Sequence, residues 1–277
     1  MRIGLTSDIH TDFSSANRKI VEHIVDVIGK ANPDVFIICG DISPDVITLS
    51  KTLLAFHDLD AKKLFIAGNH DIWIANGKKK VSSSDKYSLI TKVCKECGFH
   101  HLGSSPLIID RVGFCGTIGW YDYSYRIDKY SIPESSYMKK TFGNSVWNDV
   151  NYARWNATDI KVAHHFENEL KNQIDLVRDQ VSQVVVVTHH VPFRECVFYR
   201  NELPWDFFSA FMGSQGLGEI CHADPIITHA FFGHTHTEYN TKVKNVQAVC
   251  SPIGYLTDPP NDLHKYAQSR IKIIDLS

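Results

Sequence analysis

An apolar run that ends in chemically active side chains, Leu64–Asp71 (Leu-Phe-Ile-Ala-Gly-Asn-His-Asp), limits the folds open to this chain. Four apolar residues in a row are long enough for a buried strand and too short for a helix. Gly68 ends the run and permits a tight turn. We therefore expect Asn69, His70 and Asp71 at the carboxyl end of a strand, which is where open α/β sheets bind ligands.

Four other apolar runs end in the same way. Their polar residues are Asp8 and His10, then Asp41, then His189 and His190, and finally His234 and His236. Each set alone is common in turns or in partly buried pairs. Together, so many polar and ionisable groups would be costly to bury unless something satisfied them, and divalent metal ions would do so. In extended backbone, Asp8 and His10 would point the same way, as would His234 and His236.

Helical and apolar segments alternate along the chain, which is the pattern of a layered α/β fold. Helical spacing of apolar residues predicts helices over 15–30, 85–97 and 158–181. Ser43 followed by Pro44 predicts a helix cap and a helix that runs to about His57. Strands are expected at 2–8, 35–39, 64–67, 184–187, 230–232, 246–250 and 271–274, with a hairpin at 107–117.

The 277 residues fit one domain spanning 1–277 rather than two. Within it, the stretch 120–156 is crowded with aromatic residues and has no clear period. A loop this long is usually functional or mobile. Two interpretations stay open: a lid that lines a substrate pocket, and a structural insert that packs on itself. A Lys- and Ser-rich surface stretch is expected at 78–84.

Charge and cysteine content narrow the class of protein. The net charge of −2, without a basic run, argues against a general binder of nucleic acid or of anionic membranes, although a nucleotide held by a metal remains possible. No apolar run approaches a transmembrane span, and no signal core is found. Seven scattered cysteines, with the single pair Cys94 and Cys97, favour free thiols over a zinc ribbon. We expect a cytoplasmic protein.

The candidate ligands are oxygen and imidazole, without thiolate. This set suits manganese, iron, zinc or cobalt and does not choose among them. There are too many candidates for one tetrahedral zinc. Two metal ions a few ångströms apart need a bridging carboxylate, and they form a clamp for in-line displacement at phosphorus.

Five motifs in this order resemble the calcineurin-like metallophosphoesterases: Asp-x-His at 8–10, Gly-Asp at 40–41, Gly-Asn-His-Asp at 68–71, His-His-x-Pro at 189–192 and Gly-His-Thr-His at 233–236. The resemblance implies a four-layer α/β/β/α sandwich. It also implies a hydrolase of small phosphomonoesters or phosphodiesters, whose nucleophile is a hydroxide activated by two metal ions. The Asp-Arg-Gly continuation typical of the family's Ser/Thr protein phosphatases is missing after Gly40, which argues against that activity.

The resemblance also implies a role for each matched residue. One metal ion would be held by Asp8, His10 and His236, and the second by Asn69, His189 and His234. Asp41 would bridge the two ions. His70 would protonate the leaving oxygen or stabilise the transition state, and Asp71 would orient His70.

Two further residues are candidates for substrate binding. Spacing alone does not decide whether His189 or His190 is the ligand. We choose His189, because it comes first after the strand, where the family's ligand lies. His190 would then lie behind the ligands and, with Arg194, is a candidate contact to the substrate. A surface position is the alternative for Arg194.

Two other functions remain to be weighed. A nuclease of the same family would usually carry a basic surface and a DNA-binding domain, and this chain shows neither. A non-catalytic scaffold would have lost ligands or the proton-donating histidine, and this chain keeps them.

Overall fold

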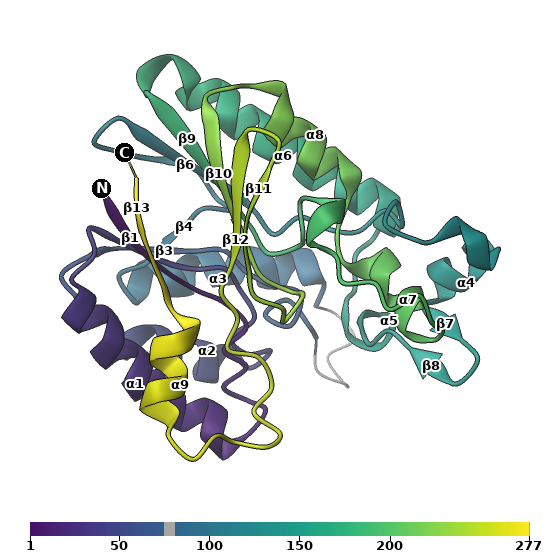
Figure 1. Ribbon diagram of the computed structural model, residues 1–277, viewed down its shortest axis with the longest axis horizontal. Helices are drawn as coiled ribbons and strands as arrows, with labels where there is room; N and C mark the ends of the chain where they lie inside the picture. Colours follow the sequence, from purple (N-terminus) through teal and green to yellow (C-terminus); the bar gives the residue numbers. More distant parts are fainter. Residues whose placement is uncertain (75–80, 277) are drawn as a thin grey trace.

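Two β-sheets lie face to face at the centre of the protein, and helices cover the outer face of each (Figure 1). The computed structural model describes residues 1–74 and 81–276. Its layers are the four that the family resemblance implied, α/β/β/α. The expected surface stretch at 78–84 falls partly on 78–80, which lie outside the described residues.

The first sheet has the order β13-β1-β2-β3-β4. Strands β1 to β4 are parallel, and β13 pairs antiparallel to β1 at the edge. The strands are β1 (Arg2–Thr6), β2 (Val35–Ile38), β3 (Lys62–Phe65), β4 (His100–His101) and β13 (Lys272–Asp275). The helices that pack on this sheet are α1 (Ser15–Ala31), α2 (Val46–Leu54), α3 (Ser83–Glu96) and α9 (Leu263–Arg270).

The second sheet has the order β11-β12-β10-β9-β6-β5, with antiparallel strands only at its two edges. Its strands are β5 (Leu107–Ile109), β6 (Val112–Thr117), β9 (Gln183–Thr188), β10 (Ile227–Phe232), β11 (Tyr239–Val243) and β12 (Val246–Cys250). Its outer face is covered by α6 (Asp159–Val177) and α8 (Gln215–Ala223).

Alternation along the strands explains the layers. In β9, Val185 and Val187 point into the core between the two sheets, whereas Val184 and Val186 point toward the outer helices. Both faces of the strand are therefore buried, which is why parallel strands of this kind appear in the sequence as continuous apolar runs. No described helix combines the length and the apolar composition that crossing a bilayer requires.

Some predicted boundaries are wrong. Helix α2 is capped by Asp45, whose side chain accepts a hydrogen bond from the backbone N–H of Thr48, so the helix begins after Asp45 and ends at Leu54. Ser43 instead accepts from the N–H of Asp45 within the preceding turn. Helix α9 and strands β4 and β11 were not predicted, because they are short or carry few apolar residues.

The aromatic insert, 120–156, is built from short elements that Figure 1 shows at one end of the molecule. These are η1 (Asp128–Tyr130), α4 (Glu134–Lys139), β7 (Thr141–Phe142), β8 (Ser145–Val146) and α5 (Asp149–Tyr152). They lie close to α7 (Trp205–Phe208), which comes after β9 in the chain. Much of the insert is core, since Trp120, Tyr121, Tyr123 and Tyr137 are buried against neighbouring apolar side chains.

Candidate metal centre

The loops that follow β1, β2, β3, β9 and β10 meet at the carboxyl ends of the strands. They bring together all seven residues predicted as metal ligands, in two groups that share Asp41. Four of the seven, Asp8, His10, Asp41 and His189, are fully buried or nearly so, and Asn69 and His234 are also buried. His236 has the most exposed side chain of the groups, at 27%.

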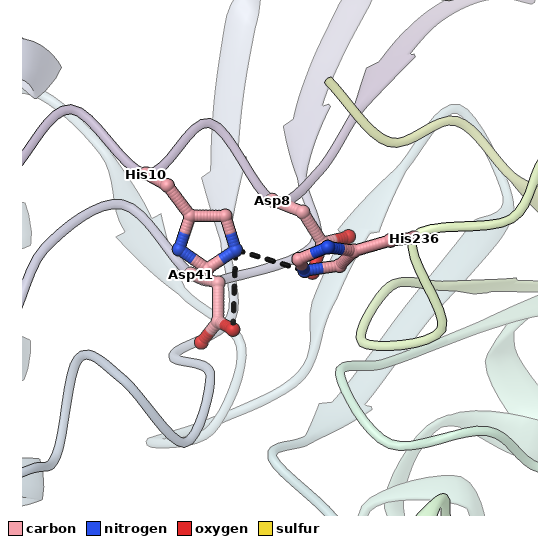
Figure 2. Close-up of side chains that lie close together, drawn as sticks. All are labelled: Asp8, His10, Asp41 and His236. Carbon is pink, nitrogen blue, oxygen red and sulfur yellow. Dashed lines mark hydrogen bonds and ion pairs between the residues drawn. The ribbon is translucent and has the colours of Figure 1, made fainter. Parts of the chain in front are cut away.

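The first group consists of Asp8, His10, Asp41 and His236, whose ligand atoms lie within 4.8 Å of one another. Figure 2 shows the four side chains converging. The Nε2 atoms of His10 and His236 are 2.9 Å apart, and the Nε2 of His236 is 3.4 Å from the Oδ1 of Asp8. The Nε2 of His10 is 3.8 Å from the Oδ2 of Asp41.

The second group consists of Asn69, His189 and His234, again with Asp41. The Oδ1 of Asn69 lies 3.1 Å from both the Nε2 of His189 and the Nδ1 of His234, and these two nitrogens are 3.2 Å apart. The Oδ1 of Asp41 is 3.4 Å from the Nε2 of His189. Asp41 therefore turns one carboxylate oxygen toward each group, as a bridging ligand would.

The donor atoms of the second group fit a cation. The other ring nitrogens of His189 and His234 face backbone carbonyls of Cys39 and Phe211, at 2.8 and 3.1 Å. A neutral imidazole that donates to a carbonyl presents a lone pair at its other nitrogen. Two such lone pairs then converge with the amide oxygen of Asn69. Three acceptors at this spacing repel one another unless a positive charge lies between them.

The electrostatics of the groups point the same way. Burial opposes ionisation of Asp41, but the imidazoles of His189 and His70 outweigh it and hold the pKa of that carboxyl well below its usual range. Burial likewise opposes protonation of His189, yet the Asp41 and Asp8 carboxylates raise its pKa to about 9, so without a cation the ring holds a proton, which a bound metal ion would displace. The pKa of Asp8 is also lowered, through His236, despite burial. The carboxylates are thus ionised and attract positive charge.

The backbone reaches these positions in an unusual way. Five ligands have left-handed backbone: Asp8, His10, Asp41, His234 and His236, with φ of 52°, 47°, 59°, 70° and 52°. The extended backbone predicted for the Asp8 and His10 pair and for the His234 and His236 pair is therefore wrong. His234 and His236 lie in different groups. Such a conformation costs a non-glycine residue about 1–3 kcal/mol and is concentrated at functional sites.

Asp71 fixes the loop of Asp41, not the ring of His70. Its buried carboxylate accepts hydrogen bonds from the backbone N–H groups of Gly68, Asp41, Ile42 and Ser43, at 2.8 to 2.9 Å. The prediction that Asp71 orients the His70 imidazole is wrong. The Asp71 carboxylate thus connects the loop after β2 to the loop after β3, and it sets the position of Asp41.

His70 lies beside both groups without belonging to either. Its ring stacks on Trp73 with centroids 3.6 Å apart, and its Nε2 is 3.1 Å from the hydroxyl of Tyr255. Burial, only partly offset by the Asp41 carboxylate, lowers the pKa of His70. Tyr255 was not predicted, since nothing in its neighbourhood in the sequence marks it. Its ring also packs 4.3 Å from that of His10.

His190 and Arg194 do not contact the space in front of the ligands. His190 is fully buried, places Nδ1 3.0 Å from the carbonyl of Ile118, and packs its ring 4.4 Å from that of His234. The guanidinium of Arg194 donates to the carbonyls of Ser124 and Arg126. Neither residue is among the described residues that line the cleft, so the prediction that they bind substrate is wrong.

A cleft of about 1040 Å³ opens directly onto the ligands. One end is formed by Asp41, Asn69, His70, His234 and His236. Aromatic side chains line much of the rest: Phe13, Trp73, Trp147, Tyr152, Phe198, Trp205, Phe208 and Tyr255. The insert contributes only Val146, Trp147, Asn148 and Tyr152 to this lining, so most of its aromatic residues serve the core instead.

Comparison with known proteins agrees with this geometry. The chain is similar in structure to a phosphopantetheinyl hydrolase from Mycobacterium tuberculosis (17% identity, TM-score 0.76, covering 94% of this chain and 93% of that one). It is also similar to a dimetal phosphatase from Danio rerio (12% identity, TM-score 0.58, covering 94% and 89%). At these identities the likeness establishes the fold alone. Among curated protein sequences, none matches significantly.

The family comparison reaches further. The model of the family described as "Calcineurin-like phosphoesterase" matches residues 1–238. That range is most of the chain and contains all seven candidate ligands as well as His70. The chain therefore belongs to the calcineurin-like phosphoesterase family, and it is a hydrolase of phosphoric ester bonds.

Proposed function

We propose that this protein uses two divalent metal ions to hydrolyse a phosphomonoester or phosphodiester whose alcohol carries an apolar or aromatic group. The observation that carries the proposal is the position of Asp41. Its two carboxylate oxygens face two separate groups of nitrogen and oxygen donors, and both groups lie at one end of the aromatic cleft. Manganese, iron and zinc all suit these donors.

Each residue of the site has a distinct role in this proposal. Asp8, His10 and His236 would hold one ion, Asn69, His189 and His234 would hold the other, and Asp41 would serve both. When bound, such a pair lowers the pKa of water and neutralises charge on the phosphoryl oxygens. His70 faces the same end of the cleft and protonates the leaving oxygen or donates a hydrogen bond in the transition state. Asp71 keeps the Asp41 loop in place.

Manganese-dependent turnover of p-nitrophenyl phosphate and bis-p-nitrophenyl phosphate tests the activity and separates the two ester classes. We expect added manganese to stimulate hydrolysis of at least one of them. A metal-loaded protein that turns over neither would contradict the proposal and would favour a non-catalytic scaffold. A panel of natural nucleotides then asks whether a nucleobase occupies the aromatic cleft.

The outer part of the cleft supports the apolar part of the proposal. Phe198 is 51% exposed, Trp205 39% and Phe13 45%, and all three line the cleft. Large apolar side chains that are exposed together around a cavity indicate a binding site. An aromatic group placed there gains both burial and stacking.

Trp205→Ala tests the apolar contact. We expect kcat/KM for 1-naphthyl phosphate to fall about tenfold, which corresponds to the loss of one aromatic contact of about 1.4 kcal/mol. Turnover of glycerol phosphate should not change, because its alcohol is polar and small. Leu176→Ala, at a position 66% exposed on α6, is the matched control. Equal losses of kcat/KM for the two substrates would show that Trp205 makes no specific contact with the aromatic group of the substrate.

Tyr255→Phe tests the hydroxyl that faces His70. Removal of the hydroxyl leaves the aromatic packing intact but takes away the partner of the His70 Nε2. We expect kcat to fall about tenfold, the cost of one hydrogen bond at roughly 1 to 1.5 kcal/mol, with metal content unchanged. Steady-state kinetics and elemental analysis check this. A wild-type kcat would exclude a role for the hydroxyl in positioning His70.

Residence in the cytoplasm stays a prediction. It rests on the cysteines, all seven of which are buried as free thiols.

A further inference from the structure

A buried carboxylate in the aromatic insert reaches the metal centre. Asp149, in α5, is 1% exposed and accepts four side-chain hydrogen bonds. Its Oδ1 accepts from the Nδ2 of Asn69 at 3.0 Å and from the indole N–H of Trp73 at 2.6 Å. Its Oδ2 accepts from the hydroxyl of Tyr121 at 3.0 Å and the indole N–H of Trp147 at 2.8 Å.

This network decides which atom of Asn69 faces the histidines. An amide can be turned over, so that either its oxygen or its NH₂ group points toward a neighbour. With the NH₂ group donating to Asp149, the Oδ1 of Asn69 points at His189 and His234. The turned-over amide would place an oxygen against the carboxylate and N–H donors against the cation. Only the observed orientation offers a ligand.

We propose that Asp149 is a positioning residue for the second metal ion: it selects the ligating orientation of Asn69 and joins that ligand to the walls of the aromatic cleft. Trp73 and Trp147 connect the cleft walls to Asp149, because both line the cleft and both donate a hydrogen bond to its carboxylate. The inference rests on the proposed role of Asn69 as a ligand. Insert, cleft wall and second metal site thereby form one hydrogen-bonded unit.

Asp159 provides a matched control from a neighbouring element. It is the first residue of α6 and also accepts from aromatic side chains that the insert contributes, the indole N–H of Trp120 and the hydroxyl of Tyr123, and from the ammonium of Lys140. Within residues 1–74 and 81–276, none of its hydrogen-bond partners is a candidate metal ligand. It ties down the insert as Asp149 does, without reaching the metal centre.

The experiment is a Mn²⁺ titration of the full chain by calorimetry and by electron paramagnetic resonance, which detects a coupled pair of ions. We expect the unaltered protein to bind two Mn²⁺ ions. Asp149→Ala should lower the affinity for the second ion about 10- to 100-fold and leave the affinity for the first unchanged, as is typical when the hydrogen-bond partner of a metal ligand is removed. Asp149→Asn keeps an acceptor oxygen for Asn69, so the affinity for the second Mn²⁺ ion should fall less than in Asp149→Ala. Asp159→Asn should retain both affinities.

The outcomes separate this inference from the proposed function. Circular dichroism first establishes that each variant is folded, and Asp149→Asn replaces the alanine variant if the latter does not fold. Equal Mn²⁺ affinities in the Asp149 and Asp159 variants, or equal weakening of both ions, would overturn the positioning role while leaving the two-metal proposal intact. An unaltered protein that binds fewer than two ions would overturn the proposed function and this inference with it.

Discussion

Asp41→Asn is expected to reduce the turnover of p-nitrophenyl phosphate by about three orders of magnitude. The carboxylate is the only ligand shared by the two groups in the described chain, with one oxygen toward His10 and the other toward His189. An asparagine offers one ligating oxygen and no negative charge, so one ion is lost. The contribution of an ion to the transition state is several kcal/mol, and 4 kcal/mol corresponds to about a thousandfold in rate.

Elemental analysis and steady-state kinetics measure the two parts of this prediction. We expect about one metal ion per chain in Asp41→Asn instead of two. Asp110→Asn is the control, since Asp110 is an exposed carboxylate in the turn between β5 and β6, where the backbone is left-handed and asparagine is well tolerated. If Asp41→Asn keeps two ions per chain, Asp41 is not the bridge.

His70→Ala is expected to reduce kcat by about 10²- to 10⁴-fold, the usual contribution of a positioned proton donor. The metal content should not change, because the ring lies outside both ligand groups. Its ring contacts Trp73, Tyr255 and the edge of the His10 ring, and its backbone N–H donates to the Oδ1 of Asp41. The alanine variant keeps that N–H.

The choice of leaving group separates the two roles open to His70. If the ring protonates the leaving oxygen, the loss should be larger for phenyl phosphate than for p-nitrophenyl phosphate, whose alcohol leaves without a proton. Equal losses would assign His70 to stabilising charge on the phosphoryl group. His57→Ala, an exposed histidine after α2, is the control. Unchanged turnover, or loss of metal, would exclude both roles.

The strand ends explain how much of the site could be predicted from the sequence. Parallel strands that lie side by side in a sheet end at one edge, so short motifs at five strand ends are brought together by the topology. That argument requires only the apolar runs, and it placed all seven candidate ligands, with His70 and His190, at strand ends. The family resemblance then implied which of them would hold metal ions. The alternation of helices and strands predicted a layered α/β fold, whereas the four layers were implied by the family resemblance and the strand order was not predicted.

The errors lie where local sequence carries no geometric information. A histidine pair does not reveal that His190 turns toward Ile118 while His189 turns toward the ligands. The left-handed backbone at Asp8 or His234 is uncommon outside glycine and leaves no mark in the sequence. Asp71 is next to His70 in the chain, yet its carboxylate is used by the loop of Asp41.

Residues that reach the site from far along the chain could not be found either. Tyr255 is 185 residues from the His70 that it contacts, and Asp149 is 80 residues from Asn69. Both contacts exist only because the two sheets and the insert are packed together. The sequence left a lid and a structural insert as alternatives for 120–156, and it could not separate Trp147, in the cleft, from Trp120, in the core.

The most direct test is an anomalous diffraction map from crystals soaked in manganese. We predict two peaks a few ångströms apart on either side of the Asp41 carboxylate, one beside Asp8, His10 and His236 and the other beside Asn69, His189 and His234. A map without peaks at these side chains would contradict the two-metal account.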